Sequence, residues 1–167
     1  GCVARLGATP VLVDIDPVSD TVVFWHCGQA PIEMADPDVA PRAVQGCDAV
    51  IIGGAGAHSV TEEYAVAAPL VQVVEQLVAA RQPLFGSCWG HQFIAKALGG
   101  TVVTDLARKE LGTYEIELSP AGEADPWLAG LPRRFGVQLG HHDRVVRLPP
   151  GAIELATPSP SLANGPR

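Results

Sequence analysis

Short runs of β-branched and aromatic residues alternate with turn residues through the first half of the chain. Residues 10–15, 21–25 and 83–85 are such runs, bounded by Pro, Ser, Asp or Gly, and residues 48–52 form a continuous apolar run that stops at Gly53. These runs predict strands. The uninterrupted run at 48–52 is typical of a strand that is buried on both faces of a parallel sheet.

Two helical patterns follow these strands. After Thr61, a residue type that caps helices, apolar side chains recur at helical spacing as far as Val78, and Pro69 predicts a kink or two short helices. A second pattern covers residues 89–98 and stops at two glycines. Strands and helices in this order indicate βαβ units, so we predict an open, mostly parallel α/β sheet flanked by helices.

The pattern changes after residue 100, where short strand-like runs are separated by turn residues. Tyr114, Ile116 and Leu118 alternate with glutamates, which predicts a strand with one solvated face. The predicted strands of this half are residues 101–104, 113–118, 135–139, 145–148 and 152–156.

Composition narrows the class of protein. Of the 167 residues, 47% are apolar and 17% are charged, which supports a hydrophobic core and disfavours disorder. The chain has 11 Lys and Arg against 18 Asp and Glu, and this net charge of -7 disfavours a nucleic-acid surface. The apolar runs are shorter than the roughly 20 residues that a transmembrane helix needs, so we expect no membrane partner.

The four cysteines, Cys2, Cys27, Cys47 and Cys88, include no CxxC pair. A closed zinc site and a small disulfide scaffold are therefore not predicted. We expect no metal, no cofactor and a reducing, cytoplasmic compartment.

The strongest chemical signal is residues 86–90 (GSCWG), placed after a predicted strand and before a predicted helix. This is the G-x-nucleophile-x-G elbow, in which glycines let the backbone make a tight, strained turn around the nucleophile. Cys88 would lie at the amino end of the helix, where free N–H groups favour a thiolate, and the N–H of Trp89 would point at an oxyanion. An isolated cysteine is more often a small buried apolar residue, but this context favours a nucleophile.

A second signal is the glycine-rich stretch at residues 53–56, directly after the strand predicted at 48–52. A loop at the carboxyl end of a parallel strand lies where ligands bind, and its N–H groups can complete an oxyanion hole. The stretch lacks both the G-x-G-x-x-G pattern and a Walker lysine, so it does not predict a phosphate site. A plain turn is the alternative.

These segments together resemble the class I glutamine amidotransferases. Residues 83–92 (PLFGSCWGHQ) resemble the nucleophile segment of that family, and residues 51–54 resemble its oxyanion strand. Later segments follow the order of its GMP-synthetase-like members, so the resemblance covers about residues 46–157. These later segments are residues 110–112, 125–127, 141–145 and 148–151.

The resemblance implies a flavodoxin-like fold and a glutaminase reaction. Cys88 would attack the side-chain amide carbon of glutamine to form a γ-glutamyl thioester, and the N–H groups of Gly54 and Trp89 would hold the oxyanion. The released ammonia would pass to an unidentified acceptor on a synthetase subunit or domain, while His91 would be structural. Contacts to the substrate would come from Gly53, Gly56, Gln92, His142 and Asp143.

The catalytic base of that family lies in a C-terminal HxE motif, whereas no histidine follows His142 in this sequence. The resemblance therefore implies a fragment, incomplete at both ends, that turns over glutamine poorly by itself. His141 or His142 as a substitute base, a γ-glutamyl hydrolase or peptidase, and a non-catalytic binding relative are the alternatives.

The same reasoning divides the chain into three parts. Residues 1–45 are interpreted as an N-terminal segment of uncertain origin that is partly strand. Residues 46–157 are interpreted as the amidotransferase-like domain, and residues 158–167 as an irregular tail.

Overall fold

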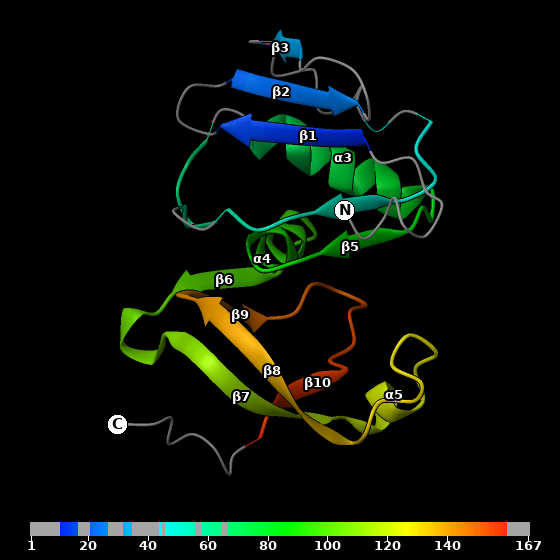
Figure 1. The fold of residues 1–167 in the computed structure, drawn as a ribbon, viewed down its shortest axis with the longest axis vertical. Coiled ribbons are helices and arrows are strands. Elements are labelled where there is room, and N and C mark those ends of the chain that lie inside the picture. Colours follow the sequence, from blue (N-terminus) through cyan, green and yellow to red (C-terminus); the bar gives the residue numbers. More distant parts are fainter. Residues whose placement is uncertain are drawn as a thin grey trace. The chain divides into compact units, whose positions relative to one another are not determined.

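The computed structural model describes residues 11–16, 21–26, 32–34, 44, 46–55, 58–64 and 67–159 (Figure 1). The chain separates into two compact units that are interleaved along the sequence. The first unit consists of Gly1–Ile51 and Glu62–Phe85, and the second consists of Ile52–Thr61 and Gly86–Arg167. The boundary crosses two strands, and each unit is described by itself below.

The first unit contains a three-stranded antiparallel sheet in the order β1-β2-β3 (Figure 1). Its strands are β1 (Val11–Asp16), β2 (Thr21–His26) and β3 (Ile32–Met34). The strands predicted at 10–15 and 21–25 are confirmed in the described residues. β3 is not among the strands predicted from the sequence, because it has only three residues and lies among prolines and acidic residues.

Strands β4 (Val50–Ile52) and β5 (Leu84–Gly86) form a two-stranded sheet. The N–H of Val50 donates to Pro83 O at 2.9 Å and the N–H of Ser87 donates to Ile52 O at 2.9 Å, so the two strands run in the same direction. All other strand pairs among the described residues are antiparallel, which makes parallel pairing less extensive than the sequence predicts. Burial on both faces is also not observed, because Ile51 is 62% exposed.

Helix α3 (Ala67–Ala79) belongs to the first unit and is a single helix. Leu70, Val73, Val74 and Leu77 are buried at helical spacing, as the sequence predicts, whereas Val78 is exposed. The predicted kink is wrong, because Pro69 lies in the first turn, where its missing N–H removes no helical hydrogen bond. Thr61 is not the cap, since α3 begins six residues later.

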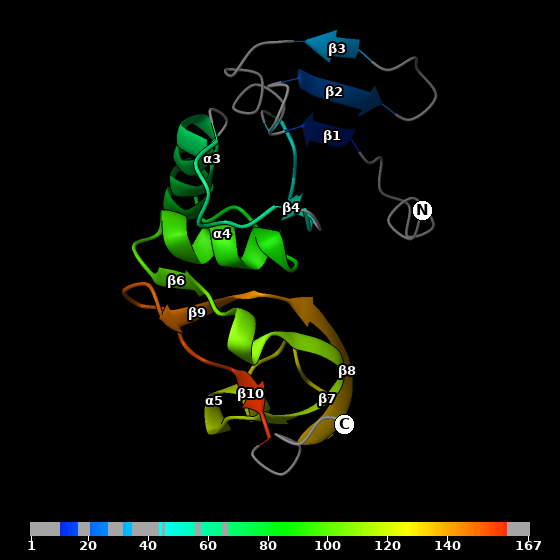
Figure 2. The ribbon, with the colours of Figure 1, turned by 90° about the vertical axis from the view of Figure 1, so that its left-hand side faces the viewer.

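The second unit contains helix α4 (Trp89–Ala97), which lies beside the antiparallel strands β6 (Thr101–Thr104) and β9 (Asp143–Arg147) (Figure 2). The helix ends where the sequence predicts. Gly99 has a φ of 89°, its N–H donates to Lys96 O, and the N–H of Gly100 donates to Ala95 O. These two bonds form a Schellman motif, which needs a residue that accepts positive φ.

A second sheet of this unit has the order β10-β7-β8, with both pairs antiparallel (Figure 1). Its strands are β7 (Glu110–Leu118), β8 (Arg134–His141) and β10 (Ala156–Pro158). The strand predicted at 152–156 is largely wrong, because only its last residue is in β10. The tail predicted from residue 158 also begins too early, because the N–H of buried Ser159 still donates to Glu115 O at 2.9 Å.

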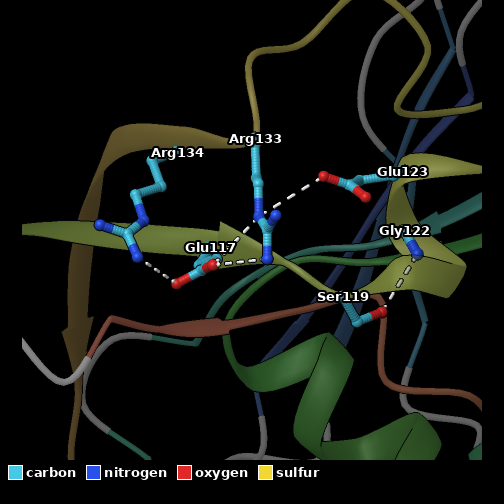
Figure 3. Close-up of polar contacts among 6 residues, drawn as sticks. All are labelled: Glu117, Ser119, Gly122, Glu123, Arg133 and Arg134. Atoms are coloured by element: carbon cyan, nitrogen blue, oxygen red, sulfur yellow. Dashed lines mark hydrogen bonds and ion pairs between the residues drawn. The ribbon is translucent and has the colours of Figure 1, made fainter.

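Short helical turns connect these strands. They are η1 (Leu106–Arg108) before β7 and α5 (Pro120–Glu123) after it. Ser119 caps α5 by accepting the N–H of Gly122 at 3.1 Å, and Glu117 pairs with Arg134 at 2.9 Å and with Arg133 at 3.1 Å (Figure 3). None of the helices in the described ranges has the length and apolar character needed to cross a membrane.

Candidate active site

Cys88 occupies the sharp turn between β5 and α4, as the sequence predicts. It is the residue directly before the helix, its backbone has φ 53° and ψ -113°, and its side chain is exposed. A positive φ is strained for a residue that carries a Cβ. Strain of this kind at an exposed thiol is typical of a nucleophile elbow.

The glycines on either side of Cys88 are required by close backbone contacts. A Cβ on Gly86 would lie 2.7 Å from the backbone N of His91, and a Cβ on Gly90 would lie 2.1 Å from Ile52 O. The N–H of Gly90 donates to Gly53 O at 3.0 Å, which ties the start of α4 to the end of β4. The turn is therefore fixed by packing as well as by hydrogen bonds.

Gly54 lies against the nucleophile. A Cβ on Gly54 would be 3.4 Å from the Cβ and 3.8 Å from the Sγ of Cys88, so the glycine loop and the elbow meet here. Trp89 is the first residue of α4, and its backbone N–H has no acceptor within the helix. The structure thus brings together the three residues, Cys88, Gly54 and Trp89, that the sequence assigns to the nucleophile and the oxyanion hole.

The thiol faces the end of β8. Cys88 Sγ lies 3.8 Å from Gly140 O, which accepts the S–H, and the next residue, His141, contacts Glu110 Oε2 through Nε2 at 3.3 Å. His91 is exposed at the surface, but partial desolvation of its ring lowers its pKa, and the charge of His141 when protonated lowers it further. His141 and Glu110 are partners in the β7–β8 pair, so this contact joins the two strands.

Two residues expected to touch the substrate are instead buried connectors. Gln92 and Asp143 are each 4% exposed, and Gln92 Nε2 donates to Asp143 O at 2.7 Å. His142 and Gly53 are exposed, as residues that contact a ligand need to be, while Gly56 lies outside the described residues. Direct contact therefore fits His142 and Gly53 better than the two buried residues.

Sequence reasoning missed the residues that surround Asp143. Its carboxylate accepts hydrogen bonds from Ser59 Oγ, from the N–H of Val60 and from Thr104 Oγ1, each at 2.7 Å. Hydroxyl residues flank buried Val60 in the sequence, which is a weak signal for such a network. Among the described side chains, no group of three His, Cys, Asp or Glu is arranged to hold a metal ion.

Comparison with known proteins identifies the family. The family model described as "Glutamine amidotransferase class-I" matches residues 21–161, which begins inside the segment interpreted as residues 1–45. The chain is 40% identical over 109 residues to a GMP synthase [glutamine-hydrolyzing] of Thermotoga sp. (strain RQ2), covering 65% of this chain and 19% of the relative. It is 33% identical over 128 residues to one subunit of the GMP synthase [glutamine-hydrolyzing] of Saccharolobus solfataricus, covering 77% of this chain and 64% of the relative.

Solved structures agree with this match. A glutamine amidotransferase of Thermotoga maritima superposes with a TM-score of 0.58 at 27% identity, covering 66% of this chain and 46% of that one. A glutamine amidotransferase of Methylobacillus flagellatus superposes with a TM-score of 0.59 at 25% identity, covering 68% of this chain and 44% of that one. The α/β, flavodoxin-like fold class predicted from the sequence is confirmed. The chain belongs to the class I glutamine amidotransferases.

Proposed function

We propose that this chain is the glutaminase module of a glutamine amidotransferase and releases ammonia from the side-chain amide of glutamine. The observation that carries the proposal is the exposed Cys88 at a positive φ before α4, with Gly54 packed against it. In such a turn, the backbone N–H of the residue after the nucleophile and an N–H of a neighbouring loop can both donate to the oxyanion. The match to the family model supports the same chemistry.

The reaction follows from this geometry in two halves. The Cys88 S–H leaves its contact with Gly140 O, and the thiolate attacks the amide carbon while the N–H groups of Gly54 and Trp89 hold the oxyanion. The proton that the Cys88 thiol gave up passes to the amide nitrogen, the C–N bond breaks, ammonia leaves and a γ-glutamyl thioester remains. Water attacks the thioester, which releases glutamate and restores the thiol.

Substrate contacts are assigned to the exposed backbone of Gly53 and to His142, and Gly56 is kept as a third candidate. Gln92 and Asp143 are assigned to holding these segments in place, since both are buried. The domain that carries the site is taken to be residues 46–157.

The ammonia acceptor is placed on another domain or on a partner protein. The chain spans 19% of one GMP synthase that it matches and 64% of the Saccharolobus solfataricus subunit, and the names of these relatives support a synthetase as the partner. We place the protein in the cytoplasm, because a catalytic thiol has to stay reduced.

The test is the release of glutamate and ammonia from glutamine by the full-length gene product. We expect turnover that is lost in Cys88→Ala, whereas Cys47→Ala, which replaces a thiol away from the elbow, keeps it. γ-Glutamyl peptides are assayed in parallel. Hydrolysis of these peptides without hydrolysis of glutamine would replace the proposal with a γ-glutamyl hydrolase, and no hydrolysis of either would favour a binding protein.

A further inference from the structure

Asp143 is a buried carboxylate that joins separate segments of the second unit. Its Oδ2 accepts from Ser59 Oγ and from the N–H of Val60, and its Oδ1 accepts from Thr104 Oγ1. The residue is 4% exposed. Burial of a carboxylate is costly unless it is hydrogen-bonded, and these three donors offset the cost of burying Asp143.

The loop that Asp143 binds is the one that carries Gly54. This loop, residues 53–61, of which 53–55 and 58–61 are described, is held at its start by the bond from the N–H of Gly90 to Gly53 O at 3.0 Å. Asp143 holds the other end through Ser59 and Val60. Without Asp143, the far end of the loop would lose the acceptor of two of its hydrogen bonds.

Further contacts reinforce the attachment at Asp143. Lys96 Nζ, on α4, donates to Val60 O at 2.7 Å, and Thr61 Oγ1 lies 2.9 Å from Thr104 Oγ1. Gln92, also on α4, donates to the backbone O of Asp143 at 2.7 Å. The far end of the loop is therefore connected to the same helix whose first turn follows Cys88.

We propose that Asp143 is a positioning residue that sets the N–H of Gly54 relative to Cys88 by holding the far end of the 53–61 loop. The inference rests on the proposed glutaminase function and replaces the expectation that Asp143 touches the substrate. An oxyanion donor acts mainly in the transition state, so its displacement lowers kcat more than it changes KM. Misplacement by about 1 Å can cost about 10²-fold in rate.

Two substitutions at the same position separate this role from others. Asp143→Ala leaves the buried N–H of Val60 without an acceptor. In Asp143→Asn, the amide oxygen of the new side chain can still accept the hydrogen bonds of Ser59 and Val60. Its NH₂ group can donate to the hydroxyl of Thr104, which then acts as acceptor. The Asn variant therefore rescues the loop although the negative charge is gone, and Glu117→Gln provides a charge-loss control on the same unit.

The experiment measures kcat and KM for glutamine in the full-length gene product, together with hydrogen exchange in peptides covering residues 53–61. In Asp143→Ala we expect kcat to fall about 10- to 100-fold with KM within about threefold, and exchange in the loop to rise while exchange in β7 stays the same. Asp143→Asn and Glu117→Gln should stay within about threefold of the parent protein in kcat. If the Ala variant does not fold, Thr104→Val tests the same attachment: it removes the Thr104 contacts to Ser59, Thr61 and Asp143 but keeps Asp143 as acceptor for Ser59 and Val60, so loop exchange should rise only modestly.

Other results overturn the inference. A higher KM at unchanged kcat in Asp143→Ala would show a substrate contact, and unchanged loop exchange in that variant would show that Asp143 does not hold the loop. Loop exchange that rises more in Thr104→Val than in Asp143→Ala would place the attachment at Thr104 instead. If the parent protein hydrolyses no glutamine, the proposed function fails, while the exchange measurement still decides whether Asp143 holds the loop.

Discussion

Gly54 and Cys88 are packed so closely that a Cβ on the glycine would touch the Cβ of the cysteine at 3.4 Å and its Sγ at 3.8 Å. A single methyl group at this distance is an ordinary contact, but a branched side chain would place further carbons against the thiol. The pair thus links the glycine loop after β4 to the elbow after β5.

The substitution Gly54→Val is therefore expected to lower glutaminase turnover by about 10²–10³-fold, the usual cost of losing one oxyanion donor. Steady-state ammonia release measures this. Gly136→Val is the matched control, because a Cβ there meets only Thr113 Cγ2 at 3.7 Å and valine suits a strand. Near-normal turnover in Gly54→Val would remove Gly54 from the oxyanion hole.

Cys88 is expected to be alkylated faster than Cys47 at neutral pH. It is exposed and lies directly before the amino end of α4, whereas Cys47 is half-buried. Limited treatment with iodoacetamide followed by peptide mass spectrometry gives the order of labelling among all four thiols. Preferential labelling of any other cysteine in the folded protein would contradict the elbow assignment.

The substitution Gly90→Ala tests the elbow as a structural unit. A methyl group there would lie 2.1 Å from Ile52 O, which is impossible without moving the strand or the helix. We expect the free energy of unfolding to fall by more than about 2 kcal/mol, at the large end for single substitutions. Chemical denaturation measures this, and a loss below about 0.5 kcal/mol would mean that the close approach of α4 and Ile52 does not exist.

Local signals in the sequence predict the elbow because the turn itself demands particular residues. Gly86 and Gly90 are fixed by backbone contacts, and the helix after Cys88 ends at Gly99, which needs a positive φ. These requirements act over a few residues, so they are visible in the chain without knowledge of the fold.

The sequence does not show in the same way which distant segments contact one another. Ser59 and Thr104 bind a carboxylate that is 84 and 39 residues away, and no periodicity marks such a pair. β10 is missed because it contains Pro158, which disfavours a strand, yet β10 lies at the edge of its sheet, where a missing N–H is tolerated. Parallel and antiparallel pairing likewise depend on which strands meet, which a short run of three to six residues does not reveal.

Two groups of polar contacts at the end of β7 should differ in their contribution to stability (Figure 3). Ser119→Ala removes the cap of α5 and the bond from Ser119 Oγ to Glu154 O, so we expect a loss of about 1 kcal/mol. Glu117→Gln weakens pairs with two exposed arginines, which contribute at most about 1 kcal/mol and are screened by salt. Denaturation at low and high salt measures the loss in free energy of unfolding for both substitutions. The loss in Glu117→Gln should shrink at high salt, whereas the loss in Ser119→Ala should not. A salt-dependent loss in Ser119→Ala alone would contradict this assignment.

His91 makes the stability of the folded chain depend on pH. Partial desolvation and the nearby His141, which itself pairs with Glu110, hold the pKa of His91 below its usual value of about 6.5. The unfolded chain therefore takes up the proton first as the pH falls, so stability is lost from about pH 6.5 downward until folded His91 is protonated as well. His91→Gln should make the free energy of unfolding less dependent on pH in this range, and His141→Gln should raise the pKa of His91 in an NMR titration of its ring. If the pH dependence of stability is the same in His91→Gln and the parent, the partial desolvation assigned to this ring is incorrect.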